Sequence, residues 1–238
     1  MKVAVIPARG GSKRIPRKNI RLFAEKPMIS YSIRAAQDSG VFDRVIVSTD
    51  DDEIAKVALG CGAEVPFIRP PELSGDHITT VAAVSHAVHW LVDHGYPIEY
   101  ACCIYATAPL VQYSDIARAF NVAMRSQWNY VFSATSFAYP ILRAIKLADD
   151  GAVKMFFPEH VHTRSQDLPE AWHDAGQFYW GRTDAWLNMI PIIGSTSTIF
   201  PVPRWRVQDI DSLDDWEYAE LLYRSSMESE HVNHPVQV

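Results

Sequence analysis

Short apolar runs alternate with longer amphipathic stretches through the first 134 residues. The runs at residues 2–7, 44–48, 64–68, 100–105 and 130–134 have the length and composition of buried strands. Helices are predicted between them, at residues 28–38, 50–60, 79–94 and 114–127, the last of these capped by Ser114 and Asp115. This alternation predicts an α/β fold in three layers, α/β/α, with a mainly parallel central sheet. Ligands in such folds bind beyond the carboxyl ends of the strands.

The pattern changes after residue 136. Residues 142–147 and 153–157 predict a β-hairpin around an Asp-Gly turn, and the segment 158–174 has no regular period. Strands return at 177–180 and 197–202, and a last helix is predicted at 212–224. We therefore expect a single domain over residues 1–227. Residues 138–175 would leave it as a small dimerisation arm, and residues 228–238 would form a flexible polar tail.

Positive charge is concentrated at the start of the chain. The first 24 residues hold seven Lys and Arg and no Asp or Glu, although the formal net charge of the chain is -6. Adjacent glycines, Gly10 and Gly11, follow the first strand, and five cations surround them: Arg9, Lys13, Arg14, Arg17 and Lys18. A glycine pair allows successive N–H groups to point into one anion-binding concavity. The loop 8–19 therefore predicts a polyanionic ligand, with a nucleoside triphosphate as the first candidate.

A basic N-terminal segment can also be a solvated face or a nucleic-acid-binding tail. Such tails are polar and disordered, whereas this loop follows a strand and contains Gly-Gly, Ile-Pro and Asn. It lacks both the Gly-x-x-x-x-Gly-Lys-Ser/Thr spacing of the P-loop and the Gly-x-Gly-x-x-Gly dinucleotide pattern. The sequence thus favours phosphates held by a long basic loop of another kind.

Two groups of acidic residues follow predicted strands. Within residues 50–53, Asp50 and Glu53 have the spacing of a helix capping box, which favours a structural use. Near the end of the chain, Asp209 and Asp211 project to one face of an extended segment. Such a pair suits Mg²⁺, which also takes phosphate oxygens from a substrate. The alternative is that these acids only favour the start of the last helix through its dipole.

Composition excludes several classes of function. No apolar run approaches the about 20 residues of a membrane span, and the N-terminus leads into a strand rather than a signal peptide. Three cysteines form neither a disulfide framework nor a Cys-x-x-Cys metal site, which favours a reducing, cytoplasmic compartment. The sequence pI of about 5.8 argues against general nucleic-acid binding. We expect a cytoplasmic protein with no nucleic-acid or membrane partner.

The ordered motifs resemble one family. Ile6-Pro-Ala-Arg-Gly-Gly-Ser-Lys-Arg-Ile-Pro-Arg-Lys-Asn19 is similar to the signature loop of the cytidylyltransferases that make CMP-sialic acids and related activated nonulosonates. Further matches follow in order: Val47-Ser-Thr-Asp50, Arg69-Pro-x-Glu-Leu73 with Asp76, Thr107-x-Pro-Leu110, Gln166-Asp-Leu-Pro169, Gly176-x-x-Tyr179 and Asp209-Ile-Asp211. The resemblance covers nearly all of residues 1–225. It implies an α/β nucleotidyltransferase, CTP and a nonulosonic acid as substrates, Mg²⁺ and a homodimer.

The resemblance also implies roles for individual residues. Those expected to hold the triphosphate are Arg9, Gly10, Ser12, Lys13, Lys18 and Asn19, and those expected to contact the cytidine are Arg69 and Thr80. Asp209 and Asp211 would carry the metal. The anomeric hydroxyl of the sugar would attack the α-phosphate of CTP and release pyrophosphate, while Arg9 and Lys13 stabilise the phosphate charge. Asp211, or a water on the metal, would take the hydroxyl proton.

The sugar-side motifs differ from those of neuraminate-activating members. Tyr105-Ala-Thr-Ala-Pro-Leu-Val111 stands in place of Gln-Pro-Thr-Ser-Pro-Leu-Arg, and Ala175-Gly-Gln-Phe-Tyr179 in place of Asn-Gly-Ala-Ile-Tyr. These runs, with residues 163–180, resemble the subgroup that activates pseudaminic acid, a deoxy and more apolar nonulosonate. The residues expected on the sugar side are Tyr105, Thr107, Arg164, Gln166 and Tyr179. Arg164 is the candidate for the sugar carboxylate.

Two alternatives stay open at this point. A CMP-N-acylneuraminate or CMP-legionaminate synthetase would differ only in the sugar that it activates. A non-catalytic nucleotide-binding regulatory protein would keep the fold without the reaction. The intact Arg9, Lys13, Asp209 and Asp211 argue against this second alternative.

Overall fold

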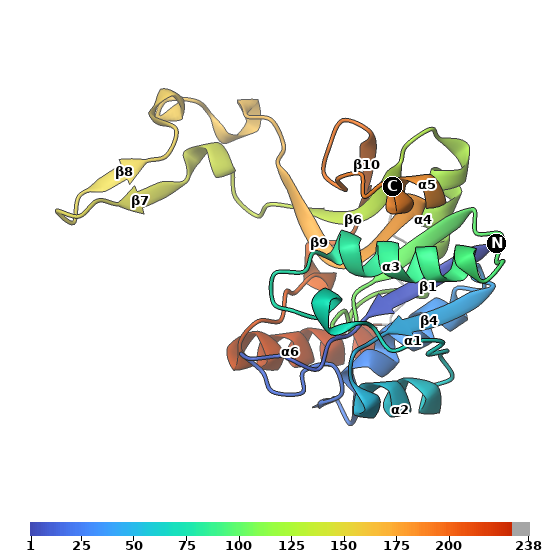
Figure 1. Cartoon of the computed structure of the whole chain (residues 1–238). Coiled ribbons are helices and arrows are strands. Elements are labelled where there is room, and N and C mark those ends of the chain that lie inside the picture. The colour runs from blue at the N-terminus through green and yellow to red at the C-terminus, as the bar shows by residue number, and fades with distance from the viewer. Residues whose placement is uncertain (230–238) are drawn as a thin grey trace.

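A six-stranded sheet forms the centre of the fold in the computed structural model, which describes residues 1–229 (Figure 1). The strands lie in the order β10 (Ser197–Pro201), β6 (Tyr130–Ser136), β9 (Trp172–Arg182), β5 (Tyr100–Ile104), β1 (Lys2–Pro7) and β4 (Arg44–Ser48). β9 is antiparallel to both of its neighbours, whereas the other neighbouring strands are parallel. The prediction of a mainly parallel sheet is confirmed.

Helices cover both faces of this sheet, because successive side chains of a strand point to opposite faces. On β1, Ala4 and Ile6 belong to a core with α1 (Met28–Asp38), α2 (Asp52–Gly60) and α4 (Tyr113–Arg125). Val3 and Val5 belong to a second core with α3 (Thr80–Asp93) and α5 (Thr183–Leu187). All four β1 side chains are fully buried. The predicted three-layer α/β/α architecture is therefore confirmed.

The last helix brings the end of the chain back to its beginning. α6 (Leu213–Ser229) contributes Trp216 to a small third core, which it shares with Ile15, Phe23 and Met28. Phe23 ends β2 (Leu22–Phe23), which pairs with β3 (Lys26–Pro27). The rings of Phe23 and Trp216 meet edge to face with centroids 5.5 Å apart. The segment before α6 therefore lies beside the N-terminal basic loop.

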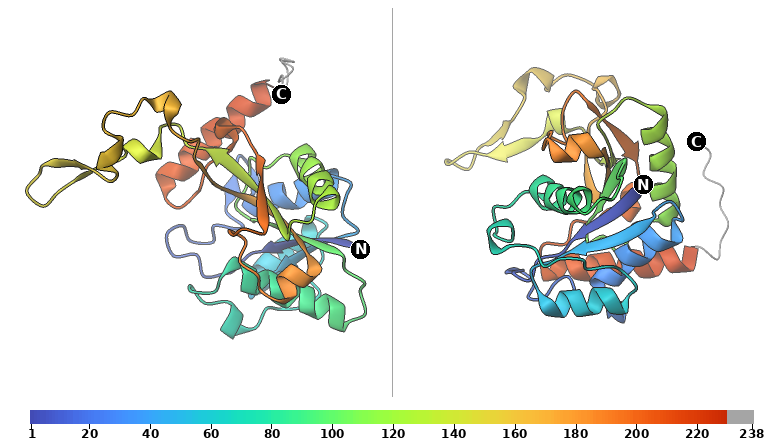
Figure 2. Two further views of the ribbon diagram at one scale, coloured as in Figure 1. Left: turned by 90° about the horizontal axis from the view of Figure 1, so that it is seen from above. Right: turned by 45° about the vertical axis from the view of Figure 1, so that its right-hand side comes forward.

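Residues 137–171 leave the sheet between β6 and β9 and extend from the body as an arm (Figures 1 and 2). The arm contains the predicted hairpin, formed by β7 (Ile145–Leu147) and β8 (Val153–Met155), and the short 3₁₀ turns η2 (Ile141–Arg143), η3 (Pro158–His160) and η4 (Ser165–Asp167). Tyr139, Ile145 and Leu147 are 83%, 62% and 75% exposed, so the arm has an uncovered apolar surface. Its assignment to dimerisation stays a prediction.

The structure corrects two predicted helix caps. Asp51, rather than Asp50, caps α2, since its side chain accepts a hydrogen bond from the Ile54 N–H. α4 follows Gln112, and Asp115, which the sequence pattern placed as a capping residue, is buried in an ion pair instead. Both errors have the same cause, because a run of adjacent polar residues does not reveal which one meets a distant partner.

Other boundaries also differ from the prediction. The segment 64–68 forms two isolated bridges, Glu64 with Ile46 and Ile68 with Thr49, rather than a continuous strand. α6 continues to Ser229 instead of ending at residue 224, so the predicted tail begins inside the helix. The remainder of that tail, 230–238, lies outside the described residues. Within residues 1–229, no helix is both long and apolar enough to cross a membrane.

Candidate active site

A cavity of about 470 Å³ opens beyond the carboxyl ends of β1 and β5. Three stretches line it: the basic loop after β1, the segment from Arg69 into α3, and the turn after β5. The predicted site residues in this lining are Arg9, Ser12, Lys13, Lys18, Asn19, Arg69, Thr80, Tyr105 and Thr107. Its volume lies within the range of small-molecule sites, about 300–1,000 Å³. The fold thus gathers the nucleotide-side candidates at the predicted edge of the sheet.

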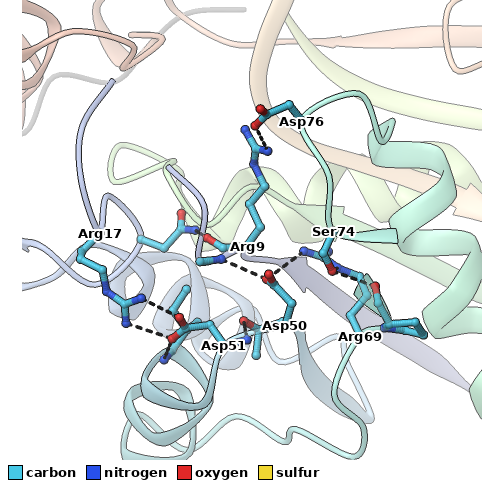
Figure 3. Close-up of polar contacts among 12 residues, drawn as sticks. Arg9, Arg17, Asp50, Asp51, Arg69, Ser74 and Asp76 are labelled. Carbon is cyan, nitrogen blue, oxygen red and sulfur yellow. Dashed lines mark hydrogen bonds and ion pairs between the residues drawn. The ribbon is translucent and has the colours of Figure 1, made fainter. Parts of the chain in front are cut away.

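Two cations of the cavity lining converge on one carboxylate. Arg9 Nη1 lies 2.5 Å from Asp76 Oδ1 (Figure 3). Lys13 donates to the other oxygen of the same carboxylate. Lys13 and Arg9 together lower the pKa of Asp76 to about 2. Asp76 lies between η1 (Pro71–Leu73) and α3. Two cations that can reach one anion at the same time suit the oxygens of a phosphate chain.

Asp50 joins the basic loop to Arg69. The Gly10 N–H donates to Asp50 Oδ1 at 3.0 Å, and this oxygen lies 3.7 Å from Arg69 Nη2 (Figure 3). Burial lowers the pKa of Arg69, whose side chain is only 3% exposed, and the Asp50 carboxylate opposes that shift. The charge of Arg69 is therefore compensated from the end of β4.

Glycine is needed at position 10 because the Asp51 side chain lies close to it, and not because the backbone angle is unusual. A Cβ at this position would lie 2.6 Å from Asp51 Oδ2, while a Cβ on Gly11 would meet nothing within 4 Å. Neither glycine has a positive φ, so the pair does not adopt the left-handed conformation on which the predicted N–H concavity depended. The predicted contact of Gly10 with phosphate stays a prediction.

Arg17 fastens the loop to the start of α2. Its φ of +57° lies in the left-handed region, which is unusual for a residue with a side chain. Its guanidinium donates to both Asp51 oxygens, at 2.6 and 2.9 Å, and also to Glu53. Arg17 lowers the pKa of Asp51, the α2 cap. This bidentate pair offsets the backbone strain at Arg17 and fixes the loop beside β4.

The acidic pair lies on the opposite flank of the same loop. Arg14 Nη2 is 2.6 Å from Asp211 Oδ1, and Lys18 Nζ is 3.7 Å from that oxygen. Lys18 also donates to the Ile210 carbonyl at 2.6 Å. In the described residues, the Asp209 carboxylate has no hydrogen bond or ion pair. Partial desolvation raises its pKa, and the neighbouring Asp211 carboxylate adds to that shift.

Two tyrosines lie where the turn after β5 meets the cavity, Tyr105 in its lining and Tyr179 behind it. The Tyr105 hydroxyl lies 2.9 Å from Thr80 Oγ1, and its ring packs on Tyr179 with centroids 5.1 Å apart. Tyr179 is buried and donates to Asp174 Oδ2 at 2.6 Å. Burial raises the pKa of Tyr179 far above its usual range, so it acts as a neutral donor. Tyr105 and Tyr179 therefore connect the cavity lining to Asp174 through one ring contact and one hydrogen bond.

Some predicted residues do not belong to the cavity lining. These are Gly10, Arg164, Gln166, Tyr179, Asp209 and Asp211. Gly10 and Asp211 contact residues of the site, whereas Arg164 and Gln166 are exposed at η4 in the arm. The structure thus brings the nucleotide-side candidates together and leaves these two sugar-side candidates away from the cavity.

Sequence reasoning gave no site role to Asp50, Asp76 or Asp174. Asp50 and Asp76 were matched only as motif positions, and their partners in the loop lie 40 and 67 residues away. The balance of charge is the feature of the sequence that could have identified Asp50 and Asp76 as site residues. Five cations in one loop require compensating carboxylates nearby, and these two acids follow a strand and a turn near the same edge of the sheet.

The comparisons with known proteins fix the class of this protein. Residues 3–175 match the family model described as Cytidylyltransferase. The chain therefore belongs to the cytidylyltransferase family and is a nucleotidyltransferase.

Two relatives come from Campylobacter jejuni, strains 81-176 and NCTC 11168, and each is named pseudaminic acid cytidylyltransferase. Each is 46% identical to this chain over 227 residues, which cover 95% of this chain and 98% of the relative. N-acylneuraminate cytidylyltransferase A of Danio rerio is 34% identical over 91% of this chain and 49% of its own length.

Solved structures share the fold at low sequence identity. A CMP:2-keto-3-deoxy-manno-octonic acid synthetase complexed with CTP has a TM-score of 0.71 and 16% identity, covering 94% of this chain and 99% of the other. A 4-diphosphocytidyl-2C-methyl-D-erythritol synthase from Anaerococcus prevotii has a TM-score of 0.64 and 13% identity, covering 94% and 98%. The predicted nucleotidyltransferase fold is thereby confirmed.

Proposed function

We propose that this protein transfers CMP from CTP to pseudaminic acid, giving CMP-pseudaminic acid and pyrophosphate. The observation that carries the proposal is the 46% identity, over 95% of the chain, to two proteins named for this activity. The cavity supports it, because Arg9 and Lys13 line a space beside the buried Arg69 and the Tyr105 turn. A triphosphate, a base and a sugar acid would find separate surfaces there.

The triphosphate would lie along the basic loop. Arg9 and Lys13 would leave Asp76 and bind oxygens of the transferring and leaving phosphates, so that charge is neutralised as the bond to pyrophosphate breaks. Ser12, Lys18 and Asn19 line the same cavity and would complete the phosphate contacts. Gly10 would approach the phosphates through its backbone. On the base side, Arg69 and Thr80 would contact the cytidine.

The residues Asp209 and Asp211 fit a divalent cation. Their carboxylates are hard oxygen ligands, and partial desolvation together with the neighbouring Asp211 carboxylate raises the pKa of Asp209, so a cation between them would be favoured. No cluster of three or more His, Cys, Asp or Glu forms a metal site within residues 1–229. Two protein ligands therefore fit Mg²⁺, whose other ligands are commonly water and phosphate. When bound, Mg²⁺ supplies charge neutralisation to the phosphate oxygens.

The reaction forms one bond and breaks another at the α-phosphorus. The anomeric hydroxyl oxygen of the sugar attacks, and the oxygen that bridges to the β-phosphate leaves with pyrophosphate. We assign the hydroxyl proton to the Asp211 carboxylate. Arg14 and Lys18, at 2.6 and 3.7 Å, hold that carboxylate at the edge of the basic loop. These two contacts fix the position of the carboxylate beside the loop before substrates bind.

The sugar site would be completed by a second subunit. Tyr105 and Thr107 line the cavity, and Tyr179 supports Tyr105 from behind. Arg164 and Gln166 are exposed on the arm and would meet a sugar where the arm lies over another copy's cavity. The exposed apolar side chains of β7 give the arm a surface to bury. We therefore propose a homodimer in which the arm carries Arg164 to the sugar carboxylate.

The proposed compartment is the cytoplasm. Cys61, Cys102 and Cys103 are all free thiols, and the latter two are buried. Burial raises the pKa of the Cys102 and Cys103 thiols well above the ordinary range, which keeps them protonated and unreactive. A protein with three free thiols is typical of a reducing compartment. No nucleic-acid or membrane partner is proposed.

Pyrophosphate release with CTP and Mg²⁺ tests the proposal. Pseudaminic acid, N-acetylneuraminic acid, legionaminic acid and a reaction without sugar would be compared at equal concentrations. Release with pseudaminic acid well above the other three reactions is the expected result. Preferential release with another nonulosonate would support cytidylyl transfer but contradict the assignment of pseudaminic acid as the substrate. CTP binding without release in any reaction would favour the non-catalytic alternative.

A further inference from the structure

Asp115 and Arg69 are the charged residues that the fold buries in the described part of the chain. Asp115 lies in the first turn of α4 and is fully buried. Its Oδ2 is 2.5 Å from Arg206 Nη1, while Oδ1 accepts a hydrogen bond from Arg118. The side chain of Arg206 is 12% exposed and that of Arg118 is 60% exposed. The Asp115–Arg206 contact is therefore a buried ion pair, and Arg118 is its solvent-facing neighbour.

A buried ion pair contributes little to stability relative to apolar side chains of similar size, because both charges lose their hydration. Burial of this pair therefore suggests a use other than stability. Arg206 and Asp115 are separated by 91 residues, so the pair fixes two distant parts of the chain against each other.

Arg206 stands immediately before the acidic segment. It ends η5 (Arg204–Arg206), and residues 207–211 follow with Asp209 and Asp211. The Arg206 carbonyl accepts a hydrogen bond of 2.5 Å from the buried Gln177 side chain on β9. The main chain of Arg206 is thus held by the sheet and its side chain by α4. This is the first anchor of the segment.

The second anchor lies at the other end. Lys18 Nζ donates to the Ile210 carbonyl at 2.6 Å, and Ile210 is buried in the third core. The Asp215 carboxylate accepts from the N–H groups of Asp211 and Ser212, at 3.1 and 2.8 Å. Between the anchors, the Asp209 carboxylate has no described partner. The position of Asp209 relative to Asp211 therefore depends on how the two anchors hold the backbone.

We propose that the buried Asp115–Arg206 pair positions the carboxylates of Asp209 and Asp211 and thereby sets the affinity of this site for a divalent cation. The inference rests on the proposed function, in which these two residues are the metal ligands. Asp115 and Arg206 are positioning residues, since they act through the backbone that carries the ligands. Groups that orient metal ligands in this way typically change metal affinity by about 10- to 100-fold when they are lost.

Three variants separate this role from a contribution to stability. Asp115→Asn keeps the shape of the side chain and an acceptor oxygen but removes the charge. Asp115→Leu combined with Arg206→Met replaces the pair by apolar side chains, an exchange that often preserves folding stability. Arg118→Ala is the matched control, because it removes the exposed partner of the same carboxylate and leaves the 207–211 segment untouched.

Mn²⁺ binding to the full-length protein, measured by electron paramagnetic resonance without nucleotide, is the primary readout. We expect Asp115→Asn and the double variant to bind Mn²⁺ about tenfold or more weakly, and Arg118→Ala to bind as the wild type does. CTP binding in EDTA should be unchanged in all three variants. The Mg²⁺ concentration for half-maximal turnover should rise in parallel with the Mn²⁺ dissociation constant.

Wild-type Mn²⁺ affinity in a folded double variant would overturn the proposal and leave the pair a structural role alone. If the double variant does not fold, Asp115→Asn decides by the same criterion. Mn²⁺ binding that is unaffected by Asp209→Asn would also overturn it, because the ligands would then lie elsewhere. Absence of turnover with every sugar would contradict the proposed function, while the Mn²⁺ comparison would still test the positioning role.

Discussion

Asp76 Oδ1 lies 2.5 Å from Nη1 of Arg9, a residue 67 positions earlier in the sequence, and Asp76 Oδ2 accepts a hydrogen bond from Lys13. The Asp76 carboxylate is therefore paired with Arg9 and Lys13, the two cations that bind phosphates in the proposed reaction. A triphosphate that binds these cations must displace Asp76. Removing the Asp76 carboxylate should therefore change the affinity for phosphate, and the sign of that change can be measured.

Asp76→Asn should bind pyrophosphate more tightly than the wild type, because the competing charge is gone. Each exposed pair is weak, so the expected gain is about two- to fivefold. Isothermal titration would measure it, with Glu72→Gln as the control for removing a carboxylate from the same segment. Weaker binding in Asp76→Asn would instead mean that Asp76 helps to hold the phosphates.

The effect of Asp76 should not vary between pH 5 and 9, since its lowered pKa of about 2 keeps it ionised throughout. The sign for stability follows from the same shift. The folded pKa lies below the unfolded one, so the stabilising contribution is present above the unfolded pKa and is lost as the pH falls toward 2. A thermal melting series in acid would show this loss in the wild type and a smaller one in Asp76→Asn.

Gly10→Ala should weaken CTP binding, whereas Gly11→Ala should not. The new Cβ at position 10 would lie 2.6 Å from Asp51 Oδ2 and would displace the carboxylate that holds Arg17. The loop would then lose its fastening to α2. We expect a rise of about tenfold or more in the CTP dissociation constant, comparable to the loss of one charge-assisted hydrogen bond. Equal binding by both variants would show that this close approach is not needed.

Much of the architecture follows from local sequence. The apolar runs of β1, β4 and β5 are long enough, and buried enough on both faces, to specify parallel strands without knowledge of their partners. The basic loop and the acidic pair were found because residues close in sequence share their chemistry. The local sequence pattern was sufficient to predict an element or a site residue wherever the contacts that determine it are close in sequence.

Local pattern failed where the decisive partner is distant. Asp50, Asp51 and Asp115 all stand at helix starts, and the sequence gives no means to distinguish a cap from an ion pair. Asp51 caps its helix, while Asp50 turns to Gly10, 40 residues away, and Asp115 turns to Arg206, 91 residues away. The antiparallel pairing of β9 with β5 and β6 also depends on partners that are distant in the sequence.

Asp209→Asn should stabilise the metal-free protein at neutral pH while it removes the response to Mg²⁺. The folded pKa of Asp209 lies above its unfolded value, because of partial desolvation and the Asp211 carboxylate. Ionised Asp209 therefore opposes folding as the pH rises through that folded pKa, and the cost is absent below the unfolded pKa. Melting in EDTA at pH 7 should show a higher Tm for the variant, and the difference should vanish in acid. A lower Tm at pH 7 would contradict this sign.

The arm provides the last prediction. Ile145 and Leu147 of β7 lie on the same face of the hairpin as their cross-strand partners Met155 and Val153 of β8. Lys154 lies on the other face. Ile145→Glu combined with Leu147→Glu puts two charges on the exposed apolar face. These charges would have to lose their hydration in an interface, so we expect the dimer to dissociate. Lys154→Glu changes a charge on the opposite face and should leave the assembly intact.

Light scattering after size-exclusion chromatography would give the assembly state, and steady-state kinetics would give its consequence. In the dissociated variant CTP binding should persist, because Arg9, Lys13 and Arg69 all belong to one subunit. The kcat/KM for the sugar should fall about tenfold or more, the cost of a lost charge-assisted contact from Arg164. A monomer with unchanged sugar kinetics would place the whole sugar site within one chain, and a persistent dimer would place the interface away from β7.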